Sequence, residues 1–271
     1  MRRIGSSPFA FPEFRGATRR LVLINLAAYF AAVVGQLAFR ETAGGLIGAL
    51  TFQPWDFLRG ALWQPLTYSF IHFGILGTLF ELLSLWFLAG FLESFHNAPW
   101  IYSLYAASVL GTALAATAIY LIAGTLGFSL APIPLYGAFG GVFGLLAAIG
   151  VLYGDVEFLL FFAIGMKARY MAIVFGLIAI AMLFGQERMY AFAQLGGAAA
   201  GILYLRIAPR RGVHFALSEK WYGIRNRYYR WKRRRAARKF EVYMRSQGRT
   251  VRFDGHGRQI DEDADDKKRW N

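Results

Sequence analysis

Several apolar runs of roughly twenty residues, almost free of charge, constrain the fold of this chain more than any other feature. A helix of that length crosses the hydrocarbon core of a bilayer and satisfies its backbone polar groups within the segment. We place six such spans at residues 20–39, 68–92, 100–123, 135–153, 168–184 and 189–207. The predicted fold class is therefore an all-α integral membrane protein, a bundle of six transmembrane helices.

Charge divides the chain into segments. Residues 1–207 hold 11 Lys and Arg against 8 Asp and Glu, whereas residues 208–247 hold 13 against 2. Dense basic charge beside a membrane domain is typical of a juxtamembrane segment, and a polar end poor in apolar residues is typical of disorder. We predict a cytoplasmic N-terminal segment, a six-span membrane domain, a basic amphipathic juxtamembrane segment and a polar, disordered tail, at 1–19, 20–207, 208–247 and 248–271.

Lys and Arg in the short loops set the expected orientation, because cytoplasmic loops carry an excess of them. Six spans place both termini on one side, together with the basic segment and most other cations of the chain. The opposite side carries Arg40, Arg59 and Arg188. We therefore expect both termini in the cytoplasm. Short loops and the absence of cysteine favour the plasma membrane of a bacterium, its inner membrane.

The connection over residues 41–66 is apolar and aromatic, yet Gly, Pro and single charges interrupt it. Trp55 and Trp63 suit the headgroup level, where amphipathic rings settle. We expect a long external loop that lies partly in the outer leaflet, and the alternative is a seventh, broken span.

The composition excludes several kinds of site. Without cysteine there is no disulfide, no thiol catalysis and no Cys-type metal site. The four histidines, at 72, 96, 214 and 256, include no pair at metal-ligand spacing. We expect neither a metal ion nor a cofactor.

Glycines recur at helical spacing in the fourth and sixth spans. Their positions are 137, 140 and 144 in the fourth span and 197 and 201 in the sixth. Small residues four apart let membrane helices approach backbone to backbone. We expect Gly137, Gly140 and Gly144 to pack against Gly197 and Gly201.

Motifs in a fixed order resemble the rhomboid family of intramembrane serine proteases and their inactive relatives. Trp63 lies nine residues before His72, LAGFLE closes the second span, GAFG opens the fourth, and LGGAAAG lies in the sixth. The resemblance covers about residues 20–207. It implies a six-helix membrane fold with cytoplasmic ends.

The same resemblance implies that the catalytic residues are missing. Phe139 stands where the family has its nucleophilic serine, and Gln194 stands where it has its histidine base. Gly77 and Glu81 replace the two oxyanion donors. Phenylalanine offers no nucleophile, glutamine is no base at neutral pH, and an ionised carboxylate repels an oxyanion. No catalytic residue is therefore expected.

Polar side chains inside spans are candidates for function, because lipid makes them costly. A continuous helix from residue 68 would place Glu81 about 13 Å beyond His72. We expect Glu81 to be an isolated, protonated carboxyl that donates to Gln194 or a backbone carbonyl. The resemblance implies that His72 is structural and bonds loop backbone. The functional alternative is that Glu81, His72, Gln194 and Trp63 contact a client.

Residues 219–245 combine many cations with aromatic residues at helical spacing. Such a pattern is typical of a helix lying on a membrane surface, and attachment to a membrane domain favours anionic lipid over nucleic acid as the partner. The expected lipid-binding residues are Trp221, Arg230, Trp231, Arg233, Arg234 and Arg235.

These observations favour a catalytically inactive rhomboid-like protein, a pseudoprotease. The resemblance implies that such proteins bind transmembrane or membrane-tethered clients and influence their folding, degradation or trafficking. Two alternatives stay open. One is an intramembrane protease or hydrolase with residual or novel activity that uses Glu81, and the other is a structural subunit of a membrane complex.

Overall fold

A computed structural model describes the chain over residues 12–127, 134–160, 164–185 and 188–207. In the tail it describes residues 222, 225–233, 235–236, 240, 243 and 246–248. The chain divides into two compact units, Met1–Gly212 and Val213–Asn271. We describe each unit by itself.

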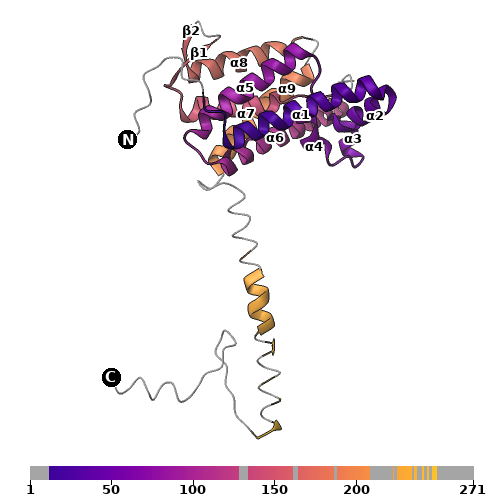
Figure 1. Ribbon diagram of the computed structural model, residues 1–271, viewed down its shortest axis with the longest axis vertical. Coiled ribbons are helices and arrows are strands. Elements are labelled where there is room, and N and C mark those ends of the chain that lie inside the picture. Colours follow the sequence, from indigo (N-terminus) through magenta and orange to yellow (C-terminus); the bar gives the residue numbers. More distant parts are fainter. Residues whose placement is uncertain are drawn as a thin grey trace. The chain divides into compact units, whose positions relative to one another are not determined.

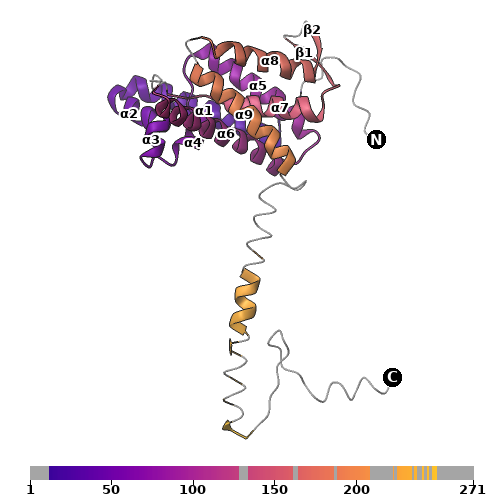
Figure 2. The ribbon, with the colours of Figure 1, turned by 180° about the vertical axis from the view of Figure 1, so that it is seen from behind.

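The first unit is a bundle of helices with one small hairpin (Figures 1 and 2). Both views place α2, α3 and α4 together at one end of the bundle, and α8 at its edge. The elements are α1 (Gly16–Ala38), α2 (Arg40–Leu50), α3 (Pro54–Leu58), α4 (Gln64–Thr67), the 3-10 helix η1 (Tyr68–Phe70), α5 (Ile75–Glu93), α6 (Ala98–Thr125), α7 (Phe139–Leu152), β1 (Glu157–Leu160), β2 (Ile164–Lys167), α8 (Ala168–Met182) and α9 (Arg188–Ile207).

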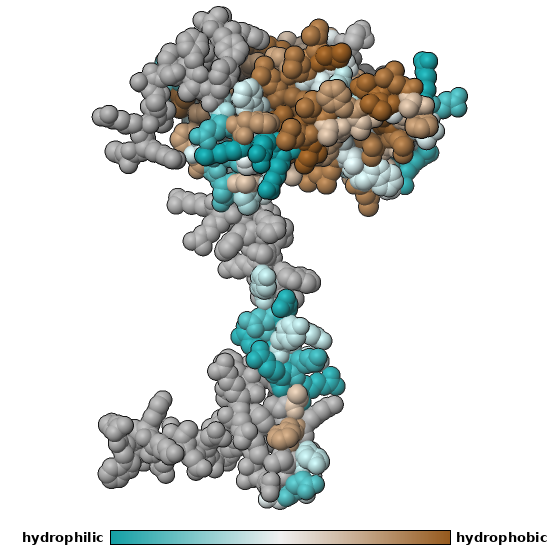
Figure 3. Space-filling model, in the orientation of Figure 1, coloured by the Kyte–Doolittle hydropathy of each residue, from teal (hydrophilic) through white to brown (hydrophobic). Residues whose placement is uncertain are grey.

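Three helices among the described residues, α1, α5 and α6, are long and apolar enough to cross a membrane. α7 and α8 are apolar but shorter, with 14 and 15 residues. Apolar residues form a broad continuous area on the visible face of this unit, as expected for a surface in contact with lipid (Figure 3). Each expected span overlaps a helix, and the count of six crossings stays a prediction.

The second span begins later than predicted. α5 starts at Ile75, and the preceding residues form η1 and an extended segment. Gly74 has φ +75, a left-handed conformation that interrupts a helix and that glycine adopts readily. His72 therefore lies outside α5, and the separation of about 13 Å expected from a continuous helix is wrong.

Residues 41–66 fold into short helices and turns, and no seventh span forms in this fully described stretch. Phe52 and Leu135 exchange backbone hydrogen bonds of 2.9 and 2.8 Å. This bridge holds the connection against the segment that leads into α7.

The prediction of an all-α fold missed one hairpin. β1 and β2 pair antiparallel, with Glu157 opposite Lys167 and Phe158 opposite Met166. Phe158 is buried against Phe91, at a ring-centroid distance of 4.8 Å. The run between the fourth and fifth spans is too short and apolar for hydropathy to separate strand from helix.

The helices α7 and α9 meet through glycine. A Cβ atom on Gly197 would lie 2.5 Å from the carbonyl oxygen of Gly140, and one on Gly201 would lie 2.8 Å from that of Gly144. Gly137 does not take part in this contact, so the prediction is wrong for that residue. It precedes α7 with φ +89 and lies against Glu81 instead.

Glu93 fixes the start of α1. Its carboxylate oxygens accept hydrogen bonds from the backbone N–H groups of Ala17 and Thr18, at 2.6 and 2.9 Å. A carboxylate at a helix N-terminus satisfies free donors and interacts favourably with the helix dipole. The end of α5 is thereby attached to the beginning of α1.

The second unit is helical over residues 225–233. Tyr228, Tyr229 and Trp231 are exposed there, and Arg225 and Arg235 lie over neighbouring aromatic rings. Trp221 and Arg234 fall outside the described residues. Lipid binding by this segment stays a prediction.

Candidate functional site

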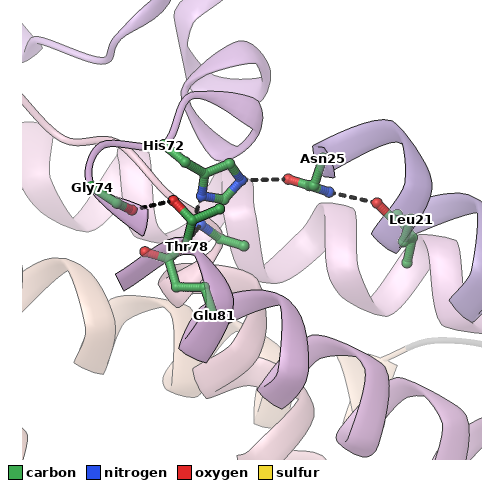
Figure 4. Close-up of polar contacts among 7 residues, drawn as sticks. Leu21, Asn25, His72, Gly74, Thr78 and Glu81 are labelled. Carbon is green, nitrogen blue, oxygen red and sulfur yellow. Dashed lines mark hydrogen bonds and ion pairs between the residues drawn. The ribbon is translucent and has the colours of Figure 1, made fainter. Parts of the chain in front are cut away.

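A buried polar cluster lies where α1, α5 and the start of α7 meet (Figure 4). Its side chains are Asn25 from α1, His72 from the segment before α5, and Glu81 from α5. Their exposed fractions are 0%, 3% and 5%. Burial of three polar side chains inside an apolar bundle is costly unless each finds a partner.

Asn25 fixes the orientation of the His72 ring. Its Nδ2 donates to the carbonyl oxygen of Leu21 at 2.7 Å, so Oδ1 faces Nε2 of His72 at 3.0 Å (Figure 4). Because an amide oxygen only accepts, Nε2 must carry a proton. The other ring nitrogen, Nδ1, is the one that faces Glu81.

Nδ1 of His72 lies 3.0 Å from Oε2 of Glu81. Nδ1 has no hydrogen-bond partner in the described part of the chain, so this contact is a close approach of charged or polar groups without hydrogen-bond geometry. The pair is either an imidazolium with a carboxylate or a neutral imidazole with a carboxyl. The pair has no net charge in either form, which limits the cost of its burial.

The same carboxylate oxygen binds the start of α7. The N–H of Ala138 donates to Oε2 of Glu81 at 2.6 Å. Ala138 is the residue that precedes the first turn of α7, where the helix dipole favours negative charge. A Cβ atom on Gly137 would lie 2.6 Å from Oε1 of Glu81, so this approach requires glycine.

A family model for the Rhomboid domain matches residues 59–211, more than half of the 271 residues. The chain belongs to the rhomboid family. A search of curated proteins found no match. Family membership and the apolar helices together identify an integral membrane protein of the intramembrane-protease-like kind.

Phe139 and Gln194, which the sequence resemblance aligned with the family's serine and histidine, lie together at a second place beside the start of α7. Phe139 begins α7, Gln194 lies in α9, and both line a cavity of about 10 Å³ together with Tyr68 and Tyr190. A water molecule needs about 10–15 Å³ by the same measure. The cavity therefore holds no more than about one water.

Two sequence-based expectations about this rhomboid site are wrong. Glu81 is not isolated and does not donate to Gln194, because its partners are His72 and the N–H of Ala138. His72 contacts two side chains, Asn25 and Glu81, and not the loop backbone. Both errors follow from the late start of α5, which brings His72 beside Glu81.

Asn25 is the member of the cluster that the sequence-based interpretation missed. A signal was present, since it is an isolated amide within the apolar run LVLINLAAY. The N–H of Ala138 leaves no such signal, because every residue but proline carries one.

The remaining candidates lie apart from the cluster. Trp63 is 54% exposed, and its Nε1 donates to the carbonyl oxygen of Ala49 at 2.9 Å. Gly77 lies on α5, where an added Cβ would meet no atom within 4 Å. Within the described part of the chain, no three His, Cys, Asp or Glu side chains are placed to hold a metal ion.

Proposed function

We propose that this member of the rhomboid family is catalytically inactive and binds transmembrane or membrane-tethered clients, whose folding, degradation or trafficking it influences. The proposal rests above all on the contact between the Glu81 carboxylate and the N–H of Ala138, directly beside Phe139. We infer further that both termini are cytoplasmic and that the membrane is a bacterial inner membrane.

Acyl transfer requires a nucleophile, a base and donors aimed at the developing oxyanion. Phe139 has no nucleophilic atom, and Gln194 accepts no proton at neutral pH. Around them, a cavity of about 10 Å³ leaves no room for a peptide bond. These features support a site without hydrolytic activity.

Glu81 opposes catalysis in a second way. Its carboxylate occupies a backbone donor at the start of α7 and brings acceptor oxygens to the place where the family has a donor. Removing a single oxyanion donor typically lowers the rate by about 10²–10³. A hydrolase that used Glu81 would have to break its contacts with His72 and Ala138 first.

Burial separates the four candidate client-binding residues. His72, Glu81 and Gln194 are at most 8% exposed, whereas Trp63 is 54% exposed. Trp63 has exposed apolar neighbours in the same connection, which together we call the Trp63 patch: Trp55, Leu58, Leu62, Trp63 and Leu66. We propose that this patch is where a client first contacts the protein.

The basic segment supports a second contact, with anionic lipid. Arg230, Arg233 and Arg235 lie within or beside the helix over 225–233, and Trp231 is exposed. Each Lys or Arg near an anionic leaflet contributes about 1 kcal/mol. We expect a peptide of residues 219–245 to bind anionic vesicles strongly at low salt and weakly at high salt. Tight binding to RNA with no affinity for vesicles would reassign the segment.

Photo-crosslinking in native membranes tests client binding. A photoreactive amino acid at Leu66, within the Trp63 patch, should capture several membrane proteins in substoichiometric amounts, and Trp63→Ala should reduce the yield. The control position is Leu114 on α6, which is 59% exposed and apolar but distant in sequence from the patch.

Equal capture at Leu66 and Leu114 would remove the Trp63 patch from the proposal. Capture of one protein at a fixed ratio would favour the structural-subunit alternative. Cleavage of a captured client by the purified protein would contradict inactivity.

A further inference from the structure

A second cavity, of about 330 Å³, lies among α7, α8 and α9. It is more than ten times the size of the cavity beside Phe139 and lies within the range of ligand pockets, about 300–1,000 Å³. Apart from Arg169, its lining is apolar or glycine. We call it the α8 groove.

Small residues open the α8 groove. Gly150 and Ala147 line it from α7, and Ala172 and Gly176 line it from α8. An added Cβ on Gly176 would meet no atom within 4 Å, so this helix face is not filled by the protein. Within a bilayer an apolar groove of this size stays dry and fills with hydrocarbon.

Positive charge lies at one end of the α8 groove. Arg169, at the first turn of α8, pairs with Asp155, and Nζ of Lys167 lies 3.7 Å from the same carboxylate. Two cations share one carboxylate, and their side chains are 45% and 40% exposed. A guanidinium has five N–H donors, so Arg169 keeps donors for a second anion.

We propose that the α8 groove binds a phospholipid, with one acyl chain between α7, α8 and α9 and the phosphate on Arg169 and Lys167. The apolar lining matches an acyl chain, and the donors that Arg169 has beyond its pair with Asp155 match a phosphate. Tyr170, whose ring lies 5.4 Å from the Arg169 guanidinium carbon, is 52% exposed and suits the headgroup level. The site is independent of the basic tail and of client binding.

The test uses the full-length protein, reconstituted with a phosphatidylglycerol that carries a diazirine in its acyl chain. After illumination, labelled peptides are identified by mass spectrometry. Label should concentrate on peptides of α7, α8 and α9 that line the groove. Gly176→Phe should fill the groove and lower this label at least about tenfold, because excluding two methylenes already removes that much affinity.

The matched control is Gly45→Phe on α2, where an added Cβ also meets no atom within 4 Å; it should leave the label unchanged. Ala147→Leu fills the groove from α7 and replaces Gly176→Phe if that variant fails to fold. Arg169→Gln combined with Lys167→Gln should lower the yield of labelling by phosphatidylglycerol. The label that remains should lie on the same groove peptides, because the acyl chain still enters the groove.

Label spread evenly over all lipid-facing helices, and unaffected by Gly176→Phe or Ala147→Leu, would overturn the proposal. So would a groove that yields no lipid label but crosslinks to a transmembrane peptide, since it would then be a protein-binding site. Equal labelling by the wild type and the Arg169→Gln, Lys167→Gln variant would overturn the assignment of the phosphate.

Discussion

The helix α7 packs differently on its two sides. On the α9 side, a Cβ atom added to Gly197 would come within 2.5 Å of the Gly140 carbonyl oxygen. One added to Gly201 would come within 2.8 Å of the Gly144 carbonyl oxygen. Against α8, a cavity of about 330 Å³ remains, and only Ala168, Met171 and Ala179 of α8 are buried. Both partners are apolar helices, so hydropathy does not distinguish them. Close packing in a membrane depends on paired small residues. On the α8 side this pairing is limited to Gly150, where an added Cβ would lie 2.7 Å from the Cβ of Ala172, and Gly176 has no atom within 4 Å of its Cβ position.

The largest difference in stability is expected between substitutions of two glycines that face α7, Gly201 on α9 and Gly176 on α8. Gly201→Leu would force a side chain into the backbone of Gly144, and we expect it to lower the free energy of unfolding by about 3 kcal/mol or to prevent folding. Gly176→Leu enters open space and should change it by less than about 1 kcal/mol. Unfolding in one detergent, followed by circular dichroism, measures both. Equal destabilisation would mean that the two sides are packed alike.

The next largest effect concerns the contact of the Glu81 side chain with the N–H of Ala138 at the start of α7. Glu81→Gln places either an amide oxygen or an NH₂ group at the position of Oε2. The oxygen can accept from the Ala138 N–H but offers no proton to Nδ1 of a neutral His72. The NH₂ group can donate to Nδ1 but cannot accept from Ala138. We therefore expect a loss of about 1–3 kcal/mol, the cost of one unsatisfied buried group. Gln194→Leu, a change on the cavity side of α7, should cost less. Infrared spectroscopy of the wild type and Glu81→Gln distinguishes the two forms of the His72–Glu81 pair, because only the carboxyl form gives a protonated-carboxyl band that the variant loses.

A smaller effect is expected at the far end of the same cluster. Asn25→Leu removes the hydrogen bond to Leu21 and the acceptor for Nε2 of His72. The expected loss is about 1–1.5 kcal/mol. A double-mutant cycle with Glu81→Gln measures whether the two contacts act through His72. Strict additivity would show that the cluster is not a connected unit.

The smallest expected effect depends on pH and lies outside both packing surfaces of α7. Burial lowers the pKa of His96 below its usual 6.5, where the ring stacks on Trp100. As the pH falls through 6.5, the unfolded chain takes up a proton that the folded protein resists, so stability should decline. His96→Gln should remove that part of the decline. An unchanged pH dependence in this variant would assign it to another group.

Hydropathy predicted much of the fold and little of the site. The six apolar runs each overlap a helix, because length and lack of charge suffice to locate a segment in lipid. The same signal placed the second span from residue 68, since YSFIHF carries no Asp, Glu, Lys or Arg and runs into the apolar helix that follows. Backbone conformation at Gly74 set the true start at Ile75. No hydropathy scale contains that information.

The contacts of the buried polar cluster were missed for a related reason. Spacing along a helix predicts which residues of one element lie on the same face. Asn25, His72 and Ala138 come from three different segments, so spacing could not bring them together. The glycines of α7 and α9 were easier, because small residues at a fixed spacing mark a packing face by themselves. Gly137 has the same spacing, but it precedes the helix and serves the contact with Glu81.

The central claim, that Glu81 and the changed residues beside it leave this rhomboid without activity, is tested most directly by stepwise restoration. Wild type, the double variant Phe139→Ser with Gln194→His, and a quadruple variant that adds Gly77→His and Glu81→Asn are treated with a fluorophosphonate probe in native membranes. Our account predicts no labelling of the wild type, little or none of the double variant, and clear labelling of the quadruple variant at residue 139. Labelling within the spans of the wild type, or equal labelling of the double and quadruple variants, would contradict it.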